Sequence, residues 1–311
     1  MRGDRRFRAG VCAAVLASAG ALGADALGAS ALTQGVGVAN GCGNQPVTGS
    51  QPVTLMVDAK LRTALVHTPP QAAAGMQLPL VIALHGVGGN GPRMESYSGL
   101  SVVADRGGFI VAYPSSHGSF WNSTGSPRLS NDVRFIRSLI AYLRQSMCVD
   151  AARIYVAGVS NGGGMAALAG CELSTQISGF ASVAGGYDDQ PVCRPKRPES
   201  VLEIHGTADQ VVPYAGGTHR RPHVGVPQFV AGWVRRDRCH GSAIVRHPAT
   251  RTTVFRWDRC AGAARVEQIR ITGGRHAWPG ATPPDPGPPS TICAACAVWG
   301  FFSSLSPSGR G

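Results

Sequence analysis

The chain has 311 residues, of which 43% are hydrophobic and 15% charged, with a formal net charge of +12 at pH 7. This length and composition support one large α/β domain with a full core. The basic residues are nearly all arginines scattered along the chain, apart from a denser stretch near Arg220-Arg221, so the charge pattern does not resemble a nucleic-acid module.

The N-terminal residues 1–31 read as a secretory signal peptide. Four arginines precede a small-residue apolar run at 11–27, and Ala29-Ser30-Ala31 offers a cleavage site. A membrane anchor is the alternative, but the run is rich in alanine and glycine and no other span follows it. A lipoprotein reading through Cys42 lacks the usual leucine upstream. We therefore expect a secreted, extracellular protein that has no membrane association after cleavage.

Strand-like and helix-like runs alternate along the rest of the chain. A polar, glycine-rich segment at 32–52 is expected to be a loosely ordered lead-in. The predicted strands are 53–57, 64–67, 78–84, 109–113, 154–157, 181–183, 201–204 and 266–271. The predicted helices are 94–106, one capped by Asn131, one after Ser160, 225–237 and 290–305. This order predicts a single catalytic domain at 53–305 with a tail at 306–311, built on a doubly wound, mostly parallel sheet with helices on both faces.

Eight cysteines remain once Cys12 leaves with the signal peptide. An even number in an exported chain predicts up to four disulfides. Spacing does not settle the pairing, although we favour Cys239 with Cys260 and Cys171 with Cys193. The Cys293-x-x-Cys296 pair has no second CxxC or histidine pair to suggest metal and no thioredoxin-like start to suggest redox chemistry, so a structural disulfide is preferred.

The segment Gly158-Val159-Ser160-Asn161-Gly162 carries the most specific signal. A short β-prone run, 154–157, comes directly before it, and a small-residue helical run follows. A G-x-S-x-G turn between a strand and a helix strains the serine and lifts its hydroxyl above the sheet edge. The N-terminus of the next helix favours an oxyanion there. Ser160 is therefore the candidate nucleophile, although glycine-serine turns also occur without function.

A serine nucleophile needs a general base and an acid that orients it, and in α/β-hydrolases they follow the serine in the order acid, then histidine. Asp209 and His276 fit, since each lies in a loop after a predicted strand. The competing acids are Asp132, Asp188 and Asp189, and a capping or loop-bracing role is sufficient for Asp132. The other histidines considered are His85, His205, His219, His223, His240 and His247. A structural role is favoured for His85 and His205.

The oxyanion hole is expected to use two backbone N–H groups, those of Asn161 and, from the glycine-rich loop at 85–91, Val87. That loop is a poor phosphate cradle because no GK[ST] follows it. Trp121 and Trp278 are expected to flank the cleft, where each would either stack on a substrate ring or pack in a loop.

Six motifs appear in order along the chain: Leu84-His85-Gly86, Trp121-Asn122, Asp132-Val133-Arg134-Phe135-Ile136, Gly158 to Met165, His205 to Asp209, and His276 to Gly280. Together they resemble the secreted polyhydroxybutyrate depolymerase/feruloyl esterase family, over about residues 50–305. The resemblance implies a Ser160–Asp209–His276 triad and no cofactor or metal. It also implies ester substrates such as feruloyl or acetyl groups on xylan, or short hydroxyalkanoate esters.

Two positions depart from the family pattern, because Arg275 and Arg134 replace expected glycines. Arg275 precedes the candidate base, where it would either pair with an acidic group of the substrate or brace its loop. The expected function is thus a secreted serine esterase. A secreted surface-binding protein on an esterase scaffold is the alternative, and the triad spacing argues against it.

Overall fold

The structure is a computed structural model that describes residues 41–126, 131–187, 193–217, 222–284 and 292–306. The expected signal peptide at 1–31, Asp188, Asp189 and His219 lie outside the described residues. All described elements belong to one compact unit, which spans Val38–Gly311.

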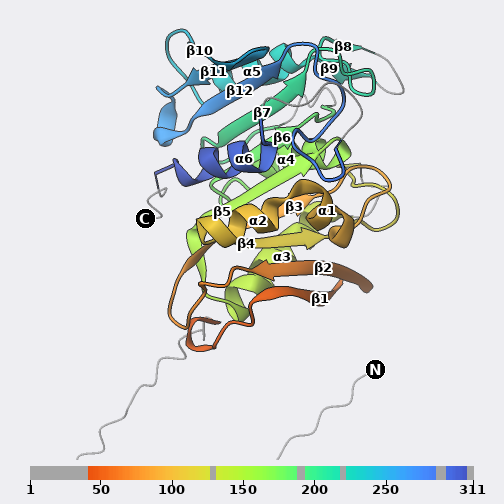
Figure 1. Cartoon of the computed structure of the whole chain (residues 1–311), viewed down its shortest axis with the longest axis vertical. Coiled ribbons are helices and arrows are strands. Elements are labelled where there is room, and N and C mark those ends of the chain that lie inside the picture. The colour runs from red at the N-terminus through yellow and green to blue at the C-terminus, as the bar shows by residue number, and fades with distance from the viewer. Residues whose placement is uncertain (1–40, 127–130, 188–192, 218–221, 285–291, 307–311) are drawn as a thin grey trace, which may run out of the picture. The chain divides into compact units, whose positions relative to one another are not determined.

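A ten-stranded sheet runs through this unit (Figure 1). Its order is β1 (Gly49–Val57), β2 (Lys60–Thr68), β4 (Ile110–Pro114), β3 (Leu78–Leu84), β5 (Val149–Val159), β6 (Gly179–Val183), β7 (Ser200–Gly206), β12 (Val266–Ile271), β11 (Thr252–Trp257) and β10 (Ile244–Ala249). The central strands β4, β3, β5, β6, β7 and β12 are mutually parallel. Strands β1 and β2 extend one end of the sheet in antiparallel pairs, and β11 and β10 extend the other. The predicted mostly parallel sheet is confirmed.

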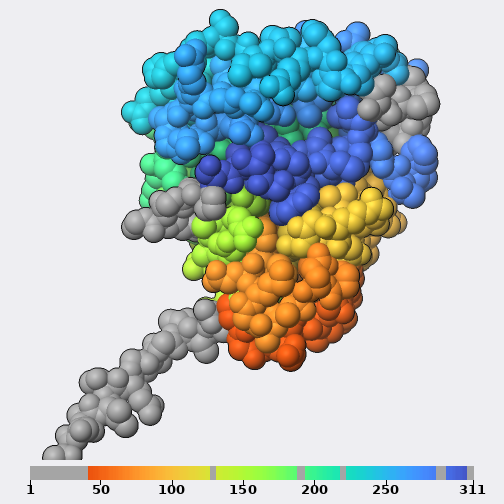
Figure 2. Space-filling model, turned by 60° about the vertical axis from the view of Figure 1, so that its left-hand side comes forward, coloured from red at the N-terminus to blue at the C-terminus, as the bar shows by residue number. Residues whose placement is uncertain are grey.

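Helices cover both faces of the sheet, and each face has its own core. One core includes α3 (Asp132–Ser146), α4 (Asn161–Glu172) and α5 (Val226–Arg236). The other includes α1 (Gly91–Ser98), α2 (Leu100–Gly107) and α6 (Ala294–Ser303), and α6 lies beside the α1–α2 segment (Figure 2). In β3, Leu80 and Ile82 enter the first core while Val81 and Ala83 enter the second. A strand covered on both faces has no polar side, which explains its continuous apolar run.

Several predicted elements are confirmed with adjusted ends. The first two strands form the expected edge hairpin, and Asn131 caps α3 by accepting a hydrogen bond from the Arg134 N–H at 2.9 Å. The prediction of a single helix at 94–106 is wrong, because this segment forms two helices. They are separated by Gly99, whose φ of 68° is a left-handed conformation that ends α1.

The expected loose segment at 32–52 is corrected for its described part. Gly49 to Pro52 already belong to β1, and Cys42 is tied by a disulfide to Cys148. The β10–β11 ribbon was not predicted. Most of β10 is exposed, so it lacks the clean alternation that marks a half-buried strand. A short pair, β8 (Gly216–Gly217) and β9 (His223–Val224), was also missed.

All eight cysteines of the described chain are paired. The bonds are Cys42–Cys148, Cys171–Cys193, Cys239–Cys260 and Cys293–Cys296. Both favoured pairings are confirmed, and so is the expectation that Cys293 and Cys296 form a disulfide. Among the described helices, none has the length and apolar character needed to cross a membrane.

Candidate active site

Ser160 occupies the turn between β5 and α4, as the motif predicts. Its backbone has φ 56° and ψ −121°, and its N–H donates to the Val183 carbonyl at 2.9 Å. A Cβ on Gly158 would lie 2.1 Å from the Gly162 carbonyl oxygen, so only glycine allows the helix to approach the strand this closely. The turn therefore holds Ser160 in a strained conformation at the N-terminus of α4, where developing negative charge is favoured.

Asp209 and His276 follow the adjacent parallel strands β7 and β12, and the structure brings their side chains together. The His276 Nδ1 lies 2.7 Å from the Asp209 Oδ2. The other oxygen of Asp209 accepts hydrogen bonds from the backbone N–H groups of Val211 and Val212, each at 2.8 Å. Burial alone would raise the pKa of the Asp209 carboxyl, but hydrogen bonds from His205 and His276 outweigh it and hold that pKa well below its usual range.

Ser160 and His276 line the same open pocket, which has a volume of about 420 Å³. Gly86 and Val87 form another part of its wall. A Cβ placed on Gly86 would lie 3.9 Å from the Ser160 Oγ, so the main chain of this loop passes directly beside the serine. The loop that is expected to supply an oxyanion N–H thus borders the hydroxyl of the candidate nucleophile.

His85 braces this loop. Its Nδ1 lies 2.7 Å from the Gly86 carbonyl oxygen, and its Nε2 accepts a hydrogen bond from the Ser116 N–H at 3.0 Å. The ring is therefore neutral with its proton on Nδ1. Burial is the largest influence on the pKa of His85 and lowers it, which agrees with a neutral ring. The structural role expected for His85 accounts for all of these contacts.

Of the two roles considered for Trp121 and Trp278, the structure favours loop packing over stacking on substrate. Each indole is only 1% exposed and each uses its N–H as a structural brace. The Trp121 Nε1–H donates to the His85 carbonyl at 2.9 Å, and the Trp278 Nε1–H donates to the Ser98 carbonyl at 3.0 Å. Neither ring presents a face to the pocket, so the alternative of loop packing holds for both.

Asn161 connects α4 to the Trp121 loop through its side chain. Its Oδ1 accepts from the Trp121 N–H at 2.6 Å, and its Nδ2 donates to the Trp121 carbonyl at 3.1 Å. This two-bond clamp fixes the first residue of α4. It leaves the backbone N–H of Asn161 in the first helical turn, next to Ser160, where such groups lack a partner within the helix.

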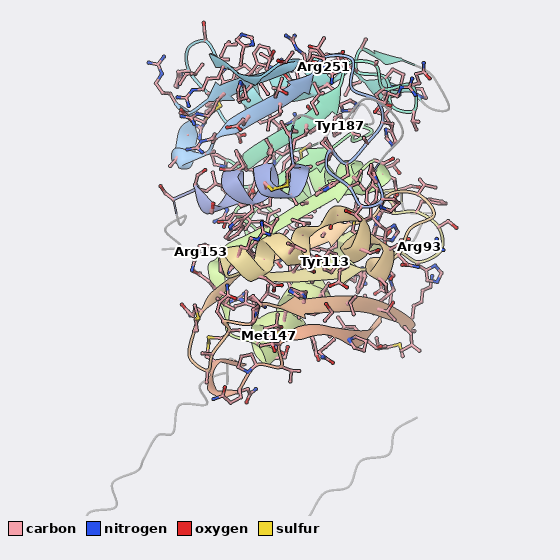
Figure 3. The ribbon with its side chains drawn as sticks, in the orientation of Figure 1. Arg93, Tyr113, Met147, Arg153, Tyr187 and Arg251 are labelled. Atoms are coloured by element: carbon pink, nitrogen blue, oxygen red, sulfur yellow. A yellow bond between two sulfur atoms is a disulfide. The ribbon has the colours of Figure 1, made fainter. Side chains whose placement is uncertain are left out.

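Two arginines lie near the pocket. Arg275, which precedes His276, is exposed and is not among the residues that line the pocket. Arg93, from the first turn of α1, does line it, and its Nη1 donates to the Gly88 carbonyl at 3.1 Å. Figure 3 shows Arg93 and Arg153 toward opposite ends of the strands, and Arg153 precedes the buried part of β5. Sequence reasoning missed Arg93; its only signal was its place just after the 85–91 loop.

Among the competing residues that the structure describes, Asp132 and His205 have other positions. Asp132 pairs with Arg62 at 2.7 Å and accepts from the Asn122 N–H at 2.8 Å, which is the loop-bracing role considered for it. His205 is buried, and its Nε2 lies 3.2 Å from the Asp209 Oδ2, the oxygen that His276 also contacts. Within the described residues, no cluster of three or more potential metal ligands occurs.

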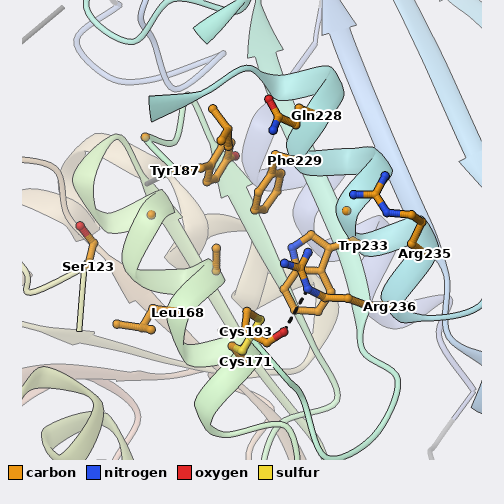
Figure 4. A pocket seen from close by; sticks show the side chains of 15 residues that line it. Ser123, Leu168, Cys171, Tyr187, Cys193, Gln228, Phe229, Trp233, Arg235 and Arg236 are labelled. Carbon is orange, nitrogen blue, oxygen red and sulfur yellow. Dashed lines mark hydrogen bonds between the residues drawn. A yellow bond between two sulfur atoms is a disulfide. The ribbon is translucent and has the colours of Figure 1, made fainter. Parts of the chain in front are cut away.

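A second pocket of about 110 Å³ lies between α4 and α5 (Figure 4). Tyr187, Phe229 and Trp233 form its aromatic wall, with the Tyr187 and Phe229 rings stacked at 3.5 Å between centroids. Arg236 extends over the Trp233 ring and donates from its Nε to the Cys193 carbonyl. Ser160 and His276 do not line this pocket, so it is separate from the candidate active site.

Comparisons with known proteins identify the family of this chain. The family described as "Esterase PHB depolymerase" matches residues 62–186. The chain is 30% identical over 256 residues to a putative esterase, NocK, of Nocardia uniformis subsp. tsuyamanensis, with 74% of each protein covered. It is 31% identical over 230 residues to feruloyl esterase B of Piromyces equi, with 70% of this chain covered. The chain spans only 42% of the length of that relative.

Solved structures support the fold. An acetyl xylan esterase from Aspergillus awamori superposes with a TM-score of 0.59 at 15% identity, covering 81% of this chain and 99% of that one. An S-formylglutathione hydrolase from Agrobacterium tumefaciens superposes with a TM-score of 0.55 at 11% identity, covering 84% and 98%. At these identities the likeness shows a shared architecture, and the α/β-hydrolase fold predicted from the sequence is confirmed.

Proposed function

The chain belongs to the Esterase PHB depolymerase family and is a carboxylic ester hydrolase, and from that premise we propose that Ser160, His276 and Asp209 form its catalytic triad. The observation that carries this proposal is the 2.7 Å contact between His276 and Asp209 beside a pocket that Ser160 also lines. The strained position of Ser160 at the N-terminus of α4 supports its role as nucleophile.

In the proposed mechanism the Ser160 Oγ attacks the ester carbonyl carbon while its proton passes to the His276 Nε2. Asp209 holds the other ring nitrogen and stabilises the imidazolium. The tetrahedral oxyanion accepts hydrogen bonds from the N–H groups of Asn161 and Val87. His276 then gives the proton to the leaving alcohol as the C–O bond breaks. Water, deprotonated by the same ring, then attacks the acyl carbon. The C–O bond to Ser160 breaks, His276 returns the proton to the Ser160 Oγ, and the acid is released.

We propose as substrates the feruloyl or acetyl esters of xylan, or hydroxyalkanoate esters. The relatives and structural neighbours named feruloyl and acetyl xylan esterases support the first class. The pocket has apolar side chains, among them Met94, Tyr97 and Val211, next to a single guanidinium from Arg93. Such a wall suits an acyl group with an aromatic or short aliphatic body. Arg275, exposed beside His276, is the proposed contact for an acidic group of a polymer outside the pocket.

Secretion is part of the proposal. Four disulfides fit an oxidising compartment, which agrees with the signal peptide expected at residues 1–31. No cofactor is needed for the proposed chemistry, because the nucleophile, base, acid and oxyanion donors all come from the chain.

The test compares the wild-type protein with Ser160→Ala on p-nitrophenyl acetate, feruloylated arabinoxylan, acetylated xylan and polyhydroxybutyrate. Loss of a triad nucleophile is expected to lower kcat by on the order of a millionfold. Ser96→Ala is the matched control, because the Ser96 hydroxyl donates to the Pro92 and Arg93 carbonyl groups of its own helix, α1. Retention of more than a few per cent of the activity by Ser160→Ala would refute Ser160 as the nucleophile. The acid that the wild-type protein releases fastest would identify the acyl class of the substrate.

A further inference from the structure

Asp209 contacts a second histidine, His205, which lies between the carboxylates of Glu203 and Asp209. Glu203 and His205 are two residues apart on β7 and therefore point to the same face of the sheet. The side chains of Glu203, His205 and Asp209 are all 0% exposed. The His205 Nδ1 lies 2.9 Å from the Glu203 Oε1, and its Nε2 lies 3.0 Å from the Val212 carbonyl oxygen and 3.2 Å from the Asp209 Oδ2.

Both ring nitrogens of His205 thus face oxygen atoms that accept hydrogen bonds. Burial raises the pKa of Glu203, and the hydrogen bond from His205 opposes that rise. With Glu203 ionised, a neutral imidazole, which has a single N–H, would direct the lone pair of its other nitrogen at a carbonyl or carboxylate oxygen. A ring protonated on both nitrogens donates on both sides. The same arrangement places four donors around the Asp209 carboxylate, two on each oxygen: the N–H groups of Val211 and Val212, His205 and His276.

We propose that Glu203 and His205 form a positioning pair that holds a fixed positive charge against Asp209 and so limits how strongly Asp209 attracts the proton on His276. The proposal rests on the proposed triad, since it acts through Asp209 and His276. Because the pair carries no net charge, it adds a dipole whose positive end meets Asp209. The pKa of His205 agrees with this. Burial alone would lower it, but hydrogen bonds to Asp209 and Glu203 raise it to about 10.

The remaining polar groups around the pair anchor its far end. The Tyr187 hydroxyl lies 2.7 Å from the Ser182 Oγ and 3.2 Å from the Glu203 Oε1. The Tyr187 ring packs against Phe229 in the α4–α5 pocket, as Figure 4 shows. Burial keeps the pKa of Tyr187 well above its usual value, so its hydroxyl stays protonated and can donate to Glu203.

From the neighbouring strand β12, Arg270 pairs in register with His205, and its guanidinium lies over the Phe255 ring at 5.0 Å. The Tyr214 ring approaches His205 at 6.0 Å between centroids, and the Gln268 Nε2 donates to the Tyr214 hydroxyl. Together with Glu203, Asp209, Tyr187 and His276, these are the charged and titratable groups that face the pair. Among the described residues, His205 and His276 are the side chains that contact the Asp209 carboxylate, at 3.2 and 2.7 Å.

The direction of the effect follows from charge. With the His205 cation present, part of the negative charge of Asp209 is compensated, so the His276 imidazolium is less stabilised and loses its proton more easily. His276 acts as a base only when neutral. Removing the cation should therefore raise the pKa that governs the acid limb of the pH–rate profile, by about one unit for a charge at this distance in a buried site.

The experiment records kcat/KM for p-nitrophenyl acetate against pH for the wild-type protein, His205→Gln and Glu203→Gln. His205→Gln should move the acid limb to higher pH by about one unit. Glu203→Gln should move it in the same direction and by less, because it removes the partner that keeps His205 charged. A merely structural role would lower kcat at every pH and leave the limb in place, which would overturn the proposal.

His67→Gln is the matched control. His67 also lies between two carboxylates, with its Nε2 2.8 Å from Asp105 and its Nδ1 3.7 Å from Glu95, but it is on β2. Strands β4, β3, β5 and β6 separate β2 from β7, so this variant should keep the wild-type acid limb.

A second measurement uses the wild-type protein and does not depend on the folding of a variant. Nitrogen NMR shifts of labelled histidine should show both nitrogens of His205 protonated from pH 5 to 9, and a neutral ring would overturn the proposal. An active Ser160→Ala would refute the triad itself. An inactive Ser160→Ala with an unmoved acid limb in His205→Gln would refute only the positioning pair.

Discussion

Asp132 shows how a single buried carboxylate can connect three parts of the domain. Its Oδ1 pairs with Arg62 of β2 at 2.7 Å, and its Oδ2 accepts from the Asn122 N–H in the loop that Asn161 also clamps. Arg62 lies over the Phe135 ring of α3 at 3.9 Å. The two side chains are 4% and 0% exposed, so neither charge is solvated by water. Loss of Arg62 would leave the Asp132 carboxylate buried without this cation beside it.

Arg62→Met is accordingly expected to destabilise the fold by about 3–5 kcal/mol. Arg134→Met is the comparison, because Arg134 pairs with Asp58 at 2.6 Å with side chains 56% and 39% exposed. An exposed pair of this kind contributes about 0–1 kcal/mol. Urea unfolding measures how far each variant lowers the free energy of unfolding. An equal decrease in both would show that the buried Arg62 pair contributes no more to stability than the exposed one.

Helix α5 ends at an acidic residue, Asp237, where the helix dipole disfavours a negative charge. Asp237 is the C-cap of α5 and is fully buried, and its Oδ1 accepts from the Glu199 N–H at 3.0 Å. Burial is the largest influence on the pKa of Asp237 and raises it from 3.8 to about 7. The Asp237 carboxyl group is therefore mostly protonated below about pH 7 in the folded protein.

The stability of the protein should depend on pH through this group. Between pH 3.8 and about 7 the folded protein keeps a proton on Asp237 that the unfolded chain releases, so the free energy of unfolding falls as pH rises through that window. Asp237→Asn keeps an oxygen that can accept from the Glu199 N–H, now as part of an amide, and it removes the titrating carboxyl group. It should match the wild type near pH 4 and exceed it at pH 8 by up to about 4 kcal/mol.

Chemical denaturation at several pH values tests this difference, with Asp58→Asn at an exposed position as the control. Parallel stability curves for wild type and Asp237→Asn would contradict the shifted carboxyl.

At the scale of the whole molecule, the four disulfides close loops of very different length. Cys42–Cys148 joins residues 106 positions apart and ties the segment before β1 to the start of β5. Cys293–Cys296 spans three positions within the first turn of α6. A cross-link stabilises chiefly by restricting the unfolded chain, and the restriction grows with the length of the loop.

Replacing Cys42 and Cys148 by alanine should therefore lower the free energy of unfolding by about 5 kcal/mol, against about 2 kcal/mol for Cys293 and Cys296. Unfolding in urea under oxidising conditions compares the two double variants. A larger loss from the short bridge would mean that its contribution comes from the folded α6 turn instead of from the unfolded chain.

Much of the fold could be predicted because its signals are local. The continuous apolar run Leu78–Leu84 marks a strand buried on both faces, and the G-x-S-x-G turn needs glycine whatever surrounds it. The nearest-neighbour cysteine pairs, such as Cys239 with Cys260, also agree with short spacing. Ser160, Asp209 and His276 were named because parallel strands place the loops that follow them along one edge of the sheet.

The amino-acid sequence is thus sufficient to predict the strand and helix periodicity, the parallel architecture and the residues proposed for the triad. The folded structure is needed to show that Trp121 and Trp278 are buried braces, that Arg93 reaches the pocket, and that His205 lies between Glu203 and Asp209. The physical reason is that periodicity and turn chemistry depend on neighbours along the chain. Burial and hydrogen-bond partners depend instead on segments far away in sequence, which meet only when the sheet and its loops assemble.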